Sequence, residues 1–234
     1  MGHAMRRAAS GLVGFSPLQV GWAHAYWAEG PEFVALGLSN GAAVSTWPDE
    51  IGTADLTQAT STKQPAYQAT AGAGSQPAVK ADGGDVLHSA TITTITQPFT
   101  LVCVLTGEDN DSVPIAADDG SLRFLYGAGT RWAIYFGNYL QSATTADFGA
   151  AHLMVAFASG SNSQIEKDGT ALVTGNAGTG TATSVTLFGG GNTPVNPSVA
   201  ALSFGAIYSG DARSDPKWAQ FKAWITSHYG ITVA

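Results

Sequence analysis

Short apolar runs alternate with clusters of glycine, asparagine, aspartate and serine along most of the chain. In its second half, runs of strand length such as residues 151–159 and 200–210 recur at intervals of about 8 to 12 residues, a spacing that favours an antiparallel sandwich. Residues 99–107, FTLVCVLTG, form the most apolar run and predict a central strand that is buried on both faces.

Two turn signals predict hairpins. Asn40-Gly41 lies between two short apolar runs, and Lys167-Asp168-Gly169 lies between QIE and TALV. Asn-Gly and Asp-Gly pairs suit tight hairpin turns, because both central residues of such turns need a positive φ. We therefore expect one hairpin early in the chain and another in its second half.

One helix is predicted near the C-terminus. Ser214 can cap its first turn, and Gly230 can end it. Between them, Trp218, Phe221 and Ile225 recur at i, i+3 and i+7. This apolar stripe predicts a helix that packs on the sandwich.

The composition fits a single all-β domain. The chain has 234 residues, of which 29 are glycine and 10 are proline, and so many turn formers favour short strands. Ten Lys and Arg against 17 Asp and Glu give a net charge of -7, which opposes binding to phosphate backbones, so we expect no nucleic-acid partner. The single cysteine, Cys103, lies in an apolar run and excludes an intrachain disulfide.

We expect residues 1–25 to form an anchoring or assembly segment in front of a domain at residues 26–234. The segment is low in charge, which suits docking against another subunit or a larger particle. Arg6, Arg7 and the small residues around His24 imitate a secretory signal peptide, but glycine, serine, proline and glutamine interrupt the apolar stretch between them. No window of the sequence is long and apolar enough to predict a membrane span.

Several motifs resemble those of a known domain family. Trp47, Asp49 and Gly52 fit its W-x-D motif, and residues 228–231, HYGI, fit the end of its last helix. QPAY and PAVKADGGDVL fit two further motifs, with Ala81 where phenylalanine is usual, through Pro65, Tyr67, Pro77, Val79, Asp82, Gly83, Asp85 and Leu87. From about residue 26 to 232, the chain thus resembles the concanavalin A-like or LamG-like jelly-roll domains of phage virion proteins, often minor tail proteins.

This resemblance implies an antiparallel jelly-roll sandwich with one C-terminal helix packed on it. It also implies a structural protein of a phage particle, located in the virion, whose partners are other virion proteins or further copies of this chain. Residues 44–69 would then be a surface crossover between the sheets, in which Trp47 fills a core edge and Asp49 bonds the turns. Because such sandwiches host lectins, hydrolases and structural modules, the resemblance predicts the fold better than the function.

The sequence carries no recognisable catalytic pattern. Hydrolases on this fold place carboxylates at alternating positions of one strand, and no strand predicted here has that spacing. Nucleophile elbows, phosphate loops and zinc motifs are also missing from the sequence. We therefore expect no enzyme and no cofactor, and we expect a structural role for each of the five histidines, His3, His24, His88, His152 and His228.

Acidic loops offer one candidate metal site. Carboxylates in residues 107–111 and 117–120 could bind calcium through hard oxygen ligands if the two loops meet, and the alternative is plain surface acids. The candidate ligands are Glu108, Asp109, Asp111, Asp118 and Asp119.

Residues 131–141, RWAIYFGNYLQ, are the candidate glycan-binding segment. Sugars stack on aromatic faces and bond to polar groups beside them. Strand alternation separates Trp132, Ile134 and Phe136 from Arg131, Ala133 and Tyr135, and one set must face the core. The candidate platform consists of Arg131, Tyr135, Asn138 and Tyr139, although aromatic strands of a sandwich also serve as core or as subunit contacts.

Two functions follow from these observations. The first is a phage virion structural protein, of minor tail or surface decoration type, whose projecting jelly roll contacts glycans of the host surface. The alternative is a non-catalytic, lectin-like module that binds a bacterial surface polysaccharide. Solvent exposure of Tyr135 and Tyr139 would favour the sugar, and an assembly role for residues 1–25 would favour the particle. A free secreted lectin of this size would need a signal peptide or a disulfide.

Overall fold

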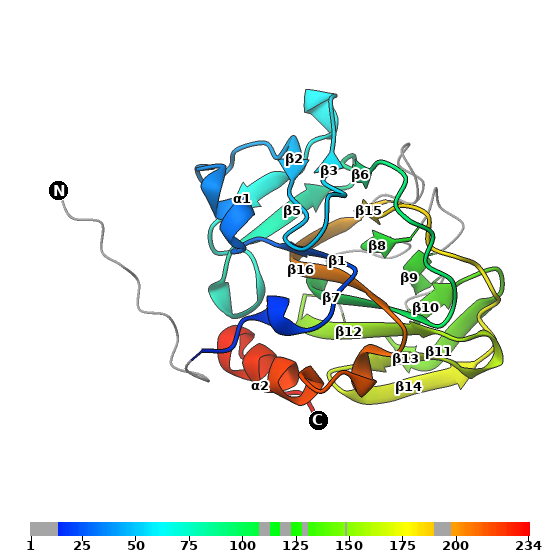
Figure 1. Ribbon diagram of the computed structural model, residues 1–234. Coiled ribbons are helices and arrows are strands. Elements are labelled where there is room, and N and C mark those ends of the chain that lie inside the picture. Colours follow the sequence, from blue (N-terminus) through cyan, green and yellow to red (C-terminus); the bar gives the residue numbers. More distant parts are fainter. Residues whose placement is uncertain (1–13, 108–112, 118–122, 128–130, 148, 190–197) are drawn as a thin grey trace.

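The computed structural model of the protein describes residues 14–107, 113–117, 123–127, 131–147, 149–189 and 198–234. Two antiparallel sheets pack face to face, and the long C-terminal helix lies on the outer face of one of them (Figure 1). The all-β antiparallel jelly-roll sandwich with a C-terminal helix, predicted from the strand pattern and the resemblance, is confirmed. No helix in the described ranges is long and apolar enough to span a membrane.

Sheet A forms the middle layer of the molecule. In spatial order it contains β14 (Thr170–Gly175), β13 (Ser163–Lys167), β12 (Ala151–Ala158), β7 (Phe99–Gly107), β16 (Val199–Ser209), β5 (Ala78–Asp82) and β4 (Ala66–Gln68). Strand β1 (His24–Trp27) joins the same sheet by pairing with the second half of β16, while β5 pairs with the first half.

Sheet B faces sheet A across the main core. In spatial order it contains β11 (Tyr139–Thr145), β10 (Arg131–Tyr135), β9 (Arg123–Gly127), β8 (Ile115–Ala116), β15 (Thr186–Leu187), β6 (Leu87–Ser89), β3 (Leu56–Thr57) and β2 (Thr46–Trp47). The helical elements are α1 (Pro31–Ala35), α2 (Trp218–Tyr229) and the 3-10 turns η1 (Pro17–Gln19), η2 (Ser61–Lys63), η3 (Ala73–Ser75), η4 (Gly160–Asn162) and η5 (Ala212–Ser214).

Strand β7 lies at the centre of the molecule, paired with β12 on one side and β16 on the other. Leu101, Cys103 and Leu105 pack between the two sheets, whereas Val102 and Val104 pack on the opposite face, toward α2. Both faces of the strand are therefore buried, as its unbroken apolar run predicts. Burial of the thiol raises the pKa of Cys103, so this cysteine is an inert core residue.

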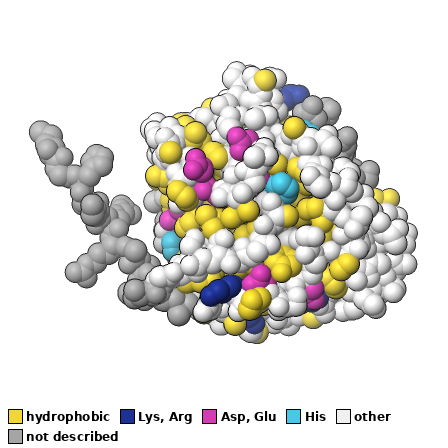
Figure 2. All heavy atoms as spheres, viewed as in Figure 1, with side chains coloured by type: hydrophobic (Ala, Val, Ile, Leu, Met, Phe, Trp, Pro, Cys, Tyr) yellow, Lys and Arg dark blue, Asp and Glu magenta, His cyan; other side chains and the backbone are white. Residues whose placement is uncertain are grey.

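Helix α2 covers the outer face of sheet A with the predicted stripe. Its buried side chains, Trp218, Phe221, Trp224, Ile225 and Tyr229, pack with residues of β7, β12 and β16. On the face shown in Figure 2, hydrophobic side chains form a band over β1, and acidic side chains gather near α1.

The start of α2 differs from the prediction. Residues 212–214 form the separate turn η5, and the Ser214 hydroxyl donates to the Asp211 carbonyl instead of capping α2. Asp215 is extended, with φ -64° and ψ 131°, because the following Pro216 disfavours helical backbone before it. The predicted end is confirmed, since Gly230 takes a left-handed φ of 72° at the C-cap.

Residues 14–27 are integrated into the sandwich. Trp22 is buried in the cluster beneath α2, and its Nε1 donates to the Pro17 carbonyl at 2.8 Å. Strand β1 then runs antiparallel to β16, from His24 opposite Ile207 onward, and crosses the boundary predicted between residues 25 and 26. Residues 1–13 lie outside the described residues, and the anchoring role of residues 1–25 stays a prediction.

The early hairpin predicted at Asn40-Gly41 is wrong. Residues Pro31–Ala35 form helix α1 instead, whose first amides are capped from a distant loop: the Glu50 carboxylate accepts hydrogen bonds from Glu32 at 3.2 Å and Phe33 at 3.0 Å. After the turn, the chain pairs with β4 rather than with the residues before the turn. A tertiary contact has overridden a local turn signal.

The hairpin predicted at residues 167–169 is confirmed. Strands β13 and β14 pair with Lys167 opposite Thr170, and the two residues between them, Asp168 and Gly169, have φ values of 52° and 80°. Two consecutive positive φ values are the geometry that makes Asp-Gly a favoured hairpin turn.

The W-x-D motif forms a core edge, as predicted. Trp47 is fully buried, with ring centroids 6.5 Å from Tyr26 and 5.4 Å from Phe33. Asp49 is also buried, and its carboxylate accepts hydrogen bonds from the amides of Ala25, Ile51 and Ala54 at 3.1 to 3.2 Å and lies 2.6 Å from Nδ1 of His24. This carboxylate ties β1 to the crossover between the sheets.

The charge of Asp49 stabilises the fold. Burial by itself would raise the pKa of this carboxyl, but the hydrogen bonds from His24 and from the backbone amides outweigh burial and hold the pKa below its ordinary value. A carboxyl whose pKa is depressed on folding contributes stability above its unfolded pKa, and that contribution is lost as the pH falls through the folded pKa.

We expect Asp49→Asn to lower the free energy of unfolding by about 2 kcal/mol at pH 7, because charged hydrogen bonds to buried amides are lost. Below about pH 4 the wild type also loses this contribution, so the difference between the two proteins shrinks. Urea unfolding at pH 7 and pH 3 measures both values. Glu32→Gln removes an exposed carboxylate as a control and should stay within about 0.5 kcal/mol. Equal losses in both variants would contradict the role of Asp49.

Candidate functional site

The alternation predicted for β10 is confirmed, and the structure shows which face is core. Trp132, Ile134 and Phe136 are at most 1% exposed and pack between the sheets. Ala133 and Tyr135 lie on the outer face of sheet B, in a small separate apolar cluster. The outer face therefore carries the side chains that were candidates for ligand contact.

Three of the four predicted glycan-binding residues lie together at the β10–β11 turn. Tyr135 and Tyr139 are directly opposite each other in register, and both point outward because Leu140, next in the chain, packs against the core. Tyr139 is 46% exposed, and Asn138 is exposed in the turn before it. Arg131 lies at the other end of β10, about 13 Å along the strand, and does not belong to this group.

Residues 176–181 lie against this turn. The amides of Phe136 and Asn138 both donate to the Ala177 carbonyl, at 2.8 and 2.9 Å. Gly178 packs so closely that a Cβ there would lie 2.2 Å from the Phe136 carbonyl oxygen, and its φ of 96° also requires glycine. The backbone of this loop is therefore fixed beside the two tyrosines.

The same loop lines a pocket at this end of the sandwich, where β12 ends and β7 begins. The pocket has a volume of about 480 Å³, within the usual range for small-ligand sites of about 300 to 1,000 Å³. Its lining residues come from three loops: Thr96, Gln97, Pro98, Ser159, Gly160, Thr179 and Thr181. None of them is ionisable, so the lining supplies no general acid, general base or charged metal ligand.

Gln97 holds these three loops together. Its Nε2 donates to the carbonyls of Gly178 and Gly180 at 3.1 and 3.0 Å, and its Oε1 accepts from the Gly160 amide at 2.7 Å. Both amide protons and the amide oxygen therefore have protein partners. The pocket wall is cross-linked by one side chain and is built before any ligand arrives.

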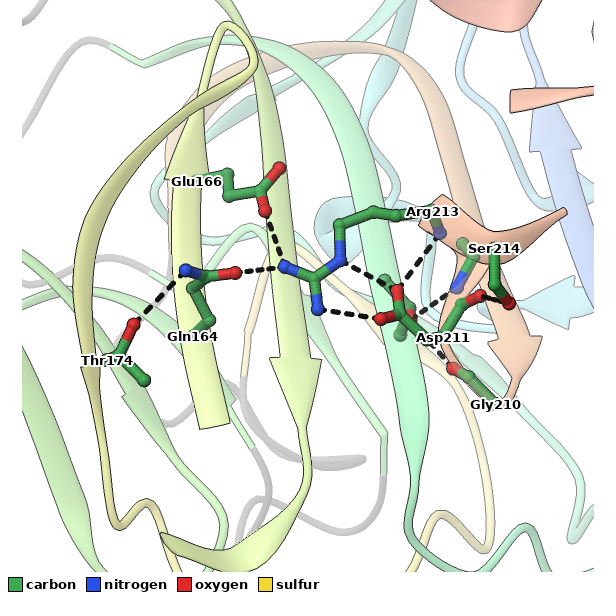
Figure 3. Close-up of polar contacts among 9 residues, drawn as sticks. Gln164, Glu166, Thr174, Gly210, Asp211, Arg213 and Ser214 are labelled. Carbon is green, nitrogen blue, oxygen red and sulfur yellow. Dashed lines mark hydrogen bonds and ion pairs between the residues drawn. The ribbon is translucent and has the colours of Figure 1, made fainter. Parts of the chain in front are cut away.

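A polar cluster on the outer face of sheet A is a structural clamp (Figure 3). Nε and Nη2 of Arg213 donate to the two carboxylate oxygens of Asp211 at 2.7 and 2.8 Å, and Nη1 bonds to Glu166 and Gln164. The guanidinium carbon also lies 4.6 Å from the ring centroid of Phe157. Burial would lower the pKa of Arg213, but these carboxylates outweigh burial and raise it. The cluster joins η5 to β13, and four of the five guanidinium N–H donors bond within the protein.

The histidines that the structure describes are separate from one another, and each bonds within the fold. The pairs, with the distances between their bonding atoms, are His24 with Asp49 (2.6 Å), His88 with Thr186 (2.7 Å), His152 with Asp168 (2.7 Å) and His228 with Glu29 (2.6 Å). These contacts fit the structural roles expected for them, and His3 lies outside the described residues. Across the described ranges, no group of three or more His, Cys, Asp or Glu side chains is placed to hold a metal ion.

The predicted calcium ligands are not placed by the structure. Glu108, Asp109, Asp111, Asp118 and Asp119 all lie outside the described residues. The calcium site therefore stays a prediction.

The pocket is the part of the site that the sequence does not predict. Its residues come from segments up to 85 positions apart, Thr96 to Thr181, and they are threonine, serine, glycine, glutamine and proline, which carry no motif. The weak signals are the TQP triplet at 96–98 and the GTGTAT repeat at 178–183. Both would be interpreted as ordinary loops.

Comparison with known proteins identifies the fold. No family model matches the sequence, and no curated protein matches it. Among solved structures, the sialidase of Trypanosoma rangeli in complex with the inhibitor DANA has a TM-score of 0.52 and 13% identity, over 97% of this chain and 37% of that one. The chain thus spans little more than a third of the sialidase.

A second similar structure is a separate domain. Domain 4 of AbnA, a GH43 extracellular arabinanase from Geobacillus stearothermophilus, in complex with arabinotriose, has a TM-score of 0.52 and 13% identity, over 70% of this chain and 86% of that one. At this identity both likenesses show the β-sandwich fold alone.

Proposed function

We propose that this chain is a non-catalytic carbohydrate-binding module of the jelly-roll fold, which binds a glycan at the β10–β11 turn. The observation that carries the proposal is the 46% exposure of Tyr139, opposite Tyr135 and next to Asn138. Aromatic rings stack on the apolar faces of sugar rings, and an adjacent amide bonds their hydroxyls. The two tyrosines supply the stacking surface, and Asn138 supplies the amide that bonds the hydroxyls.

Tyr135, Asn138 and Tyr139 form the tyrosine platform, which is also rigid enough to bind selectively. Tyr135 is half-buried against Val113, Ala116 and Ala133, and Tyr139 begins a strand whose next residue, Leu140, packs against the core. Among the large hydrophobic side chains that are exposed in the described ranges, Tyr139 is the aromatic one. Ordering such a platform costs little conformational entropy when a ligand binds.

The proposal of a non-catalytic role rests on the hydrogen bonds and the positions of the buried carboxylates. The buried carboxylates Asp49 and Asp85 both accept backbone amide hydrogen bonds, and neither lines the pocket beside the tyrosines. Glycoside hydrolysis needs two carboxyl groups across a groove. The arabinotriose complex of the similar AbnA domain supports a binding role for this fold without supplying a reaction.

Tyr139→Ala should weaken glycan binding about tenfold, because the ring that stacks on the sugar is lost. Tyr139→Phe keeps the ring and should stay within about twofold of the wild type, and Ile51→Ala, an exposed apolar residue elsewhere, should have no effect. A screen on an array of bacterial polysaccharides, followed by isothermal titration with the best binder, measures these affinities. Absence of binding to every polysaccharide on the array would overturn the proposed function.

We further propose that the module is a structural component of a phage particle, as the sequence resemblance implies. Three exposed apolar side chains support an assembly contact: Val34 at 61%, Leu36 at 42% and Ile51 at 42%. The first amides of α1 donate hydrogen bonds to the Glu50 carboxylate, which holds the loop that bears Ile51 beside that helix. Apolar residues gathered at one place on a surface are typical of contacts between subunits.

The full chain should therefore self-associate, and the triple variant V34S/L36S/I51S should shift it toward the monomer. Sedimentation velocity across a concentration series measures this shift. Tyr139→Ser is the matched control, because it removes an exposed apolar group at the β10–β11 turn and should leave the association unchanged. A wild-type chain that stays monomeric at all concentrations would contradict this assembly contact.

A further inference from the structure

We infer that the pocket held together by Gln97 is a second saccharide subsite, which takes one uncharged sugar ring of the glycan bound at the tyrosine platform. This inference rests on the proposed function and adds both a site and a class of ligand to it. Its basis is the position of the pocket, the state of its polar groups and its charge.

The position makes the pocket a neighbour of the platform. Residues 176–181 contact the β10–β11 turn through Ala177, whose carbonyl accepts both turn amides, and they line the pocket through Thr179 and Thr181. A Cβ built on Gly137, in the turn itself, would lie 3.8 Å from the Thr179 amide nitrogen. One loop of the chain therefore separates the two surfaces, and an oligosaccharide of several rings can contact both.

The polar groups of the pocket divide into a satisfied frame and free hydroxyls. Gln97 donates both of its amide protons to protein carbonyls and accepts the Gly160 amide, so its main role is to shape the wall. Within the described ranges, no hydrogen bond engages the hydroxyls of the other polar lining residues, Thr96, Ser159, Thr179 and Thr181. Each hydroxyl can both donate and accept, which matches the hydroxyls of a sugar ring.

The lining also provides an apolar contact. Pro98 is exposed beside these hydroxyls, and its saturated ring can pack against the C–H face of a sugar. A pocket of about 480 Å³ with several hydroxyls and one apolar ring suits a small polyhydroxylated ligand better than a purely apolar one.

The charge of the site favours an uncharged sugar. None of the seven lining residues is ionisable, and Arg213, near the start of β13, has its guanidinium engaged by Asp211 and Glu166. A carboxylate-bearing sugar would therefore enter the pocket without a cationic partner, at the cost of its desolvation. The net charge of -7 further disfavours an anionic polysaccharide.

The test removes the hydroxyls and keeps the shape. Thr179→Val combined with Thr181→Val should weaken binding of the best polysaccharide from the array about tenfold, since two hydrogen bonds are lost. Thr70→Val, an exposed threonine in the β4–η3 turn, is the matched control and should bind like the wild type. Ser159→Phe fills the pocket and should weaken binding at least as much. Thermal unfolding of each variant confirms that it is folded.

The outcomes separate this inference from the proposed function. Weaker binding by the pocket variants, with neutral polysaccharides preferred over uronic or sialic acid polymers, supports the subsite. Binding that depends on Tyr139 but is unchanged in the pocket variants would overturn the subsite and leave the proposed function standing. A preference for acidic polymers would overturn the uncharged class of ligand. Absence of all binding would overturn both.

Discussion

The burial of β7 on both of its faces is the constraint on which the rest of the structure depends. Leu101, Cys103 and Leu105 are covered by sheet B, but Val102 and Val104 on the opposite face would be exposed in a simple sandwich. Each buried valine side chain contributes about 1.5 to 3 kcal/mol, so this face needs a cover. Helix α2 and the chain around Trp22 provide it, from opposite ends of the sequence, and Asp215 links them by accepting the Gly21 amide at 3.1 Å.

This third layer also determines where a ligand can bind. Because α2 and the chain around Trp22 cover the centre of the outer face of sheet A, the outer face of sheet B and the ends of the sandwich stay open at the centre of the molecule. The tyrosine platform lies on the first of these, and the Gln97 pocket lies at one end. The two proposed sites thus lie on loops and at a strand end, on a scaffold that is fixed by its buried layers.

Most of the fold can be predicted from the sequence, because buried strands and the amphipathic helix leave periodic patterns. The apolar run of β7, the Asp168-Gly169 turn and the Gly230 cap are each determined by residues close together in the chain. Helix α1 cannot be predicted in this way, since its first amides are capped by Glu50 from another loop. The start of α2 depends on the restriction that Pro216 places on Asp215, which local capping rules miss.

In the candidate site too, some features follow from neighbouring residues in the chain and others depend on distant contacts. Alternation along β10 predicts which side chains point outward, and Tyr135 and Tyr139 are found there. The pocket depends on hydrogen bonds between Gln97 and residues more than 60 positions away, and no local sequence pattern indicates them. Motif residues such as Trp47 and Asp49 are buried and bond the core edge, so the features that carry the family resemblance stabilise the fold and say little about the ligand.

The measurement that tests the central claim most directly is amide chemical-shift mapping of the full chain during titration with a neutral oligosaccharide from the best polysaccharide on the array. We predict that the largest shifts occur in residues 136–140 and in the pocket loops at 96–97, 159–160 and 178–181. Shifts confined to α2, or to the Arg213 cluster, would contradict the account.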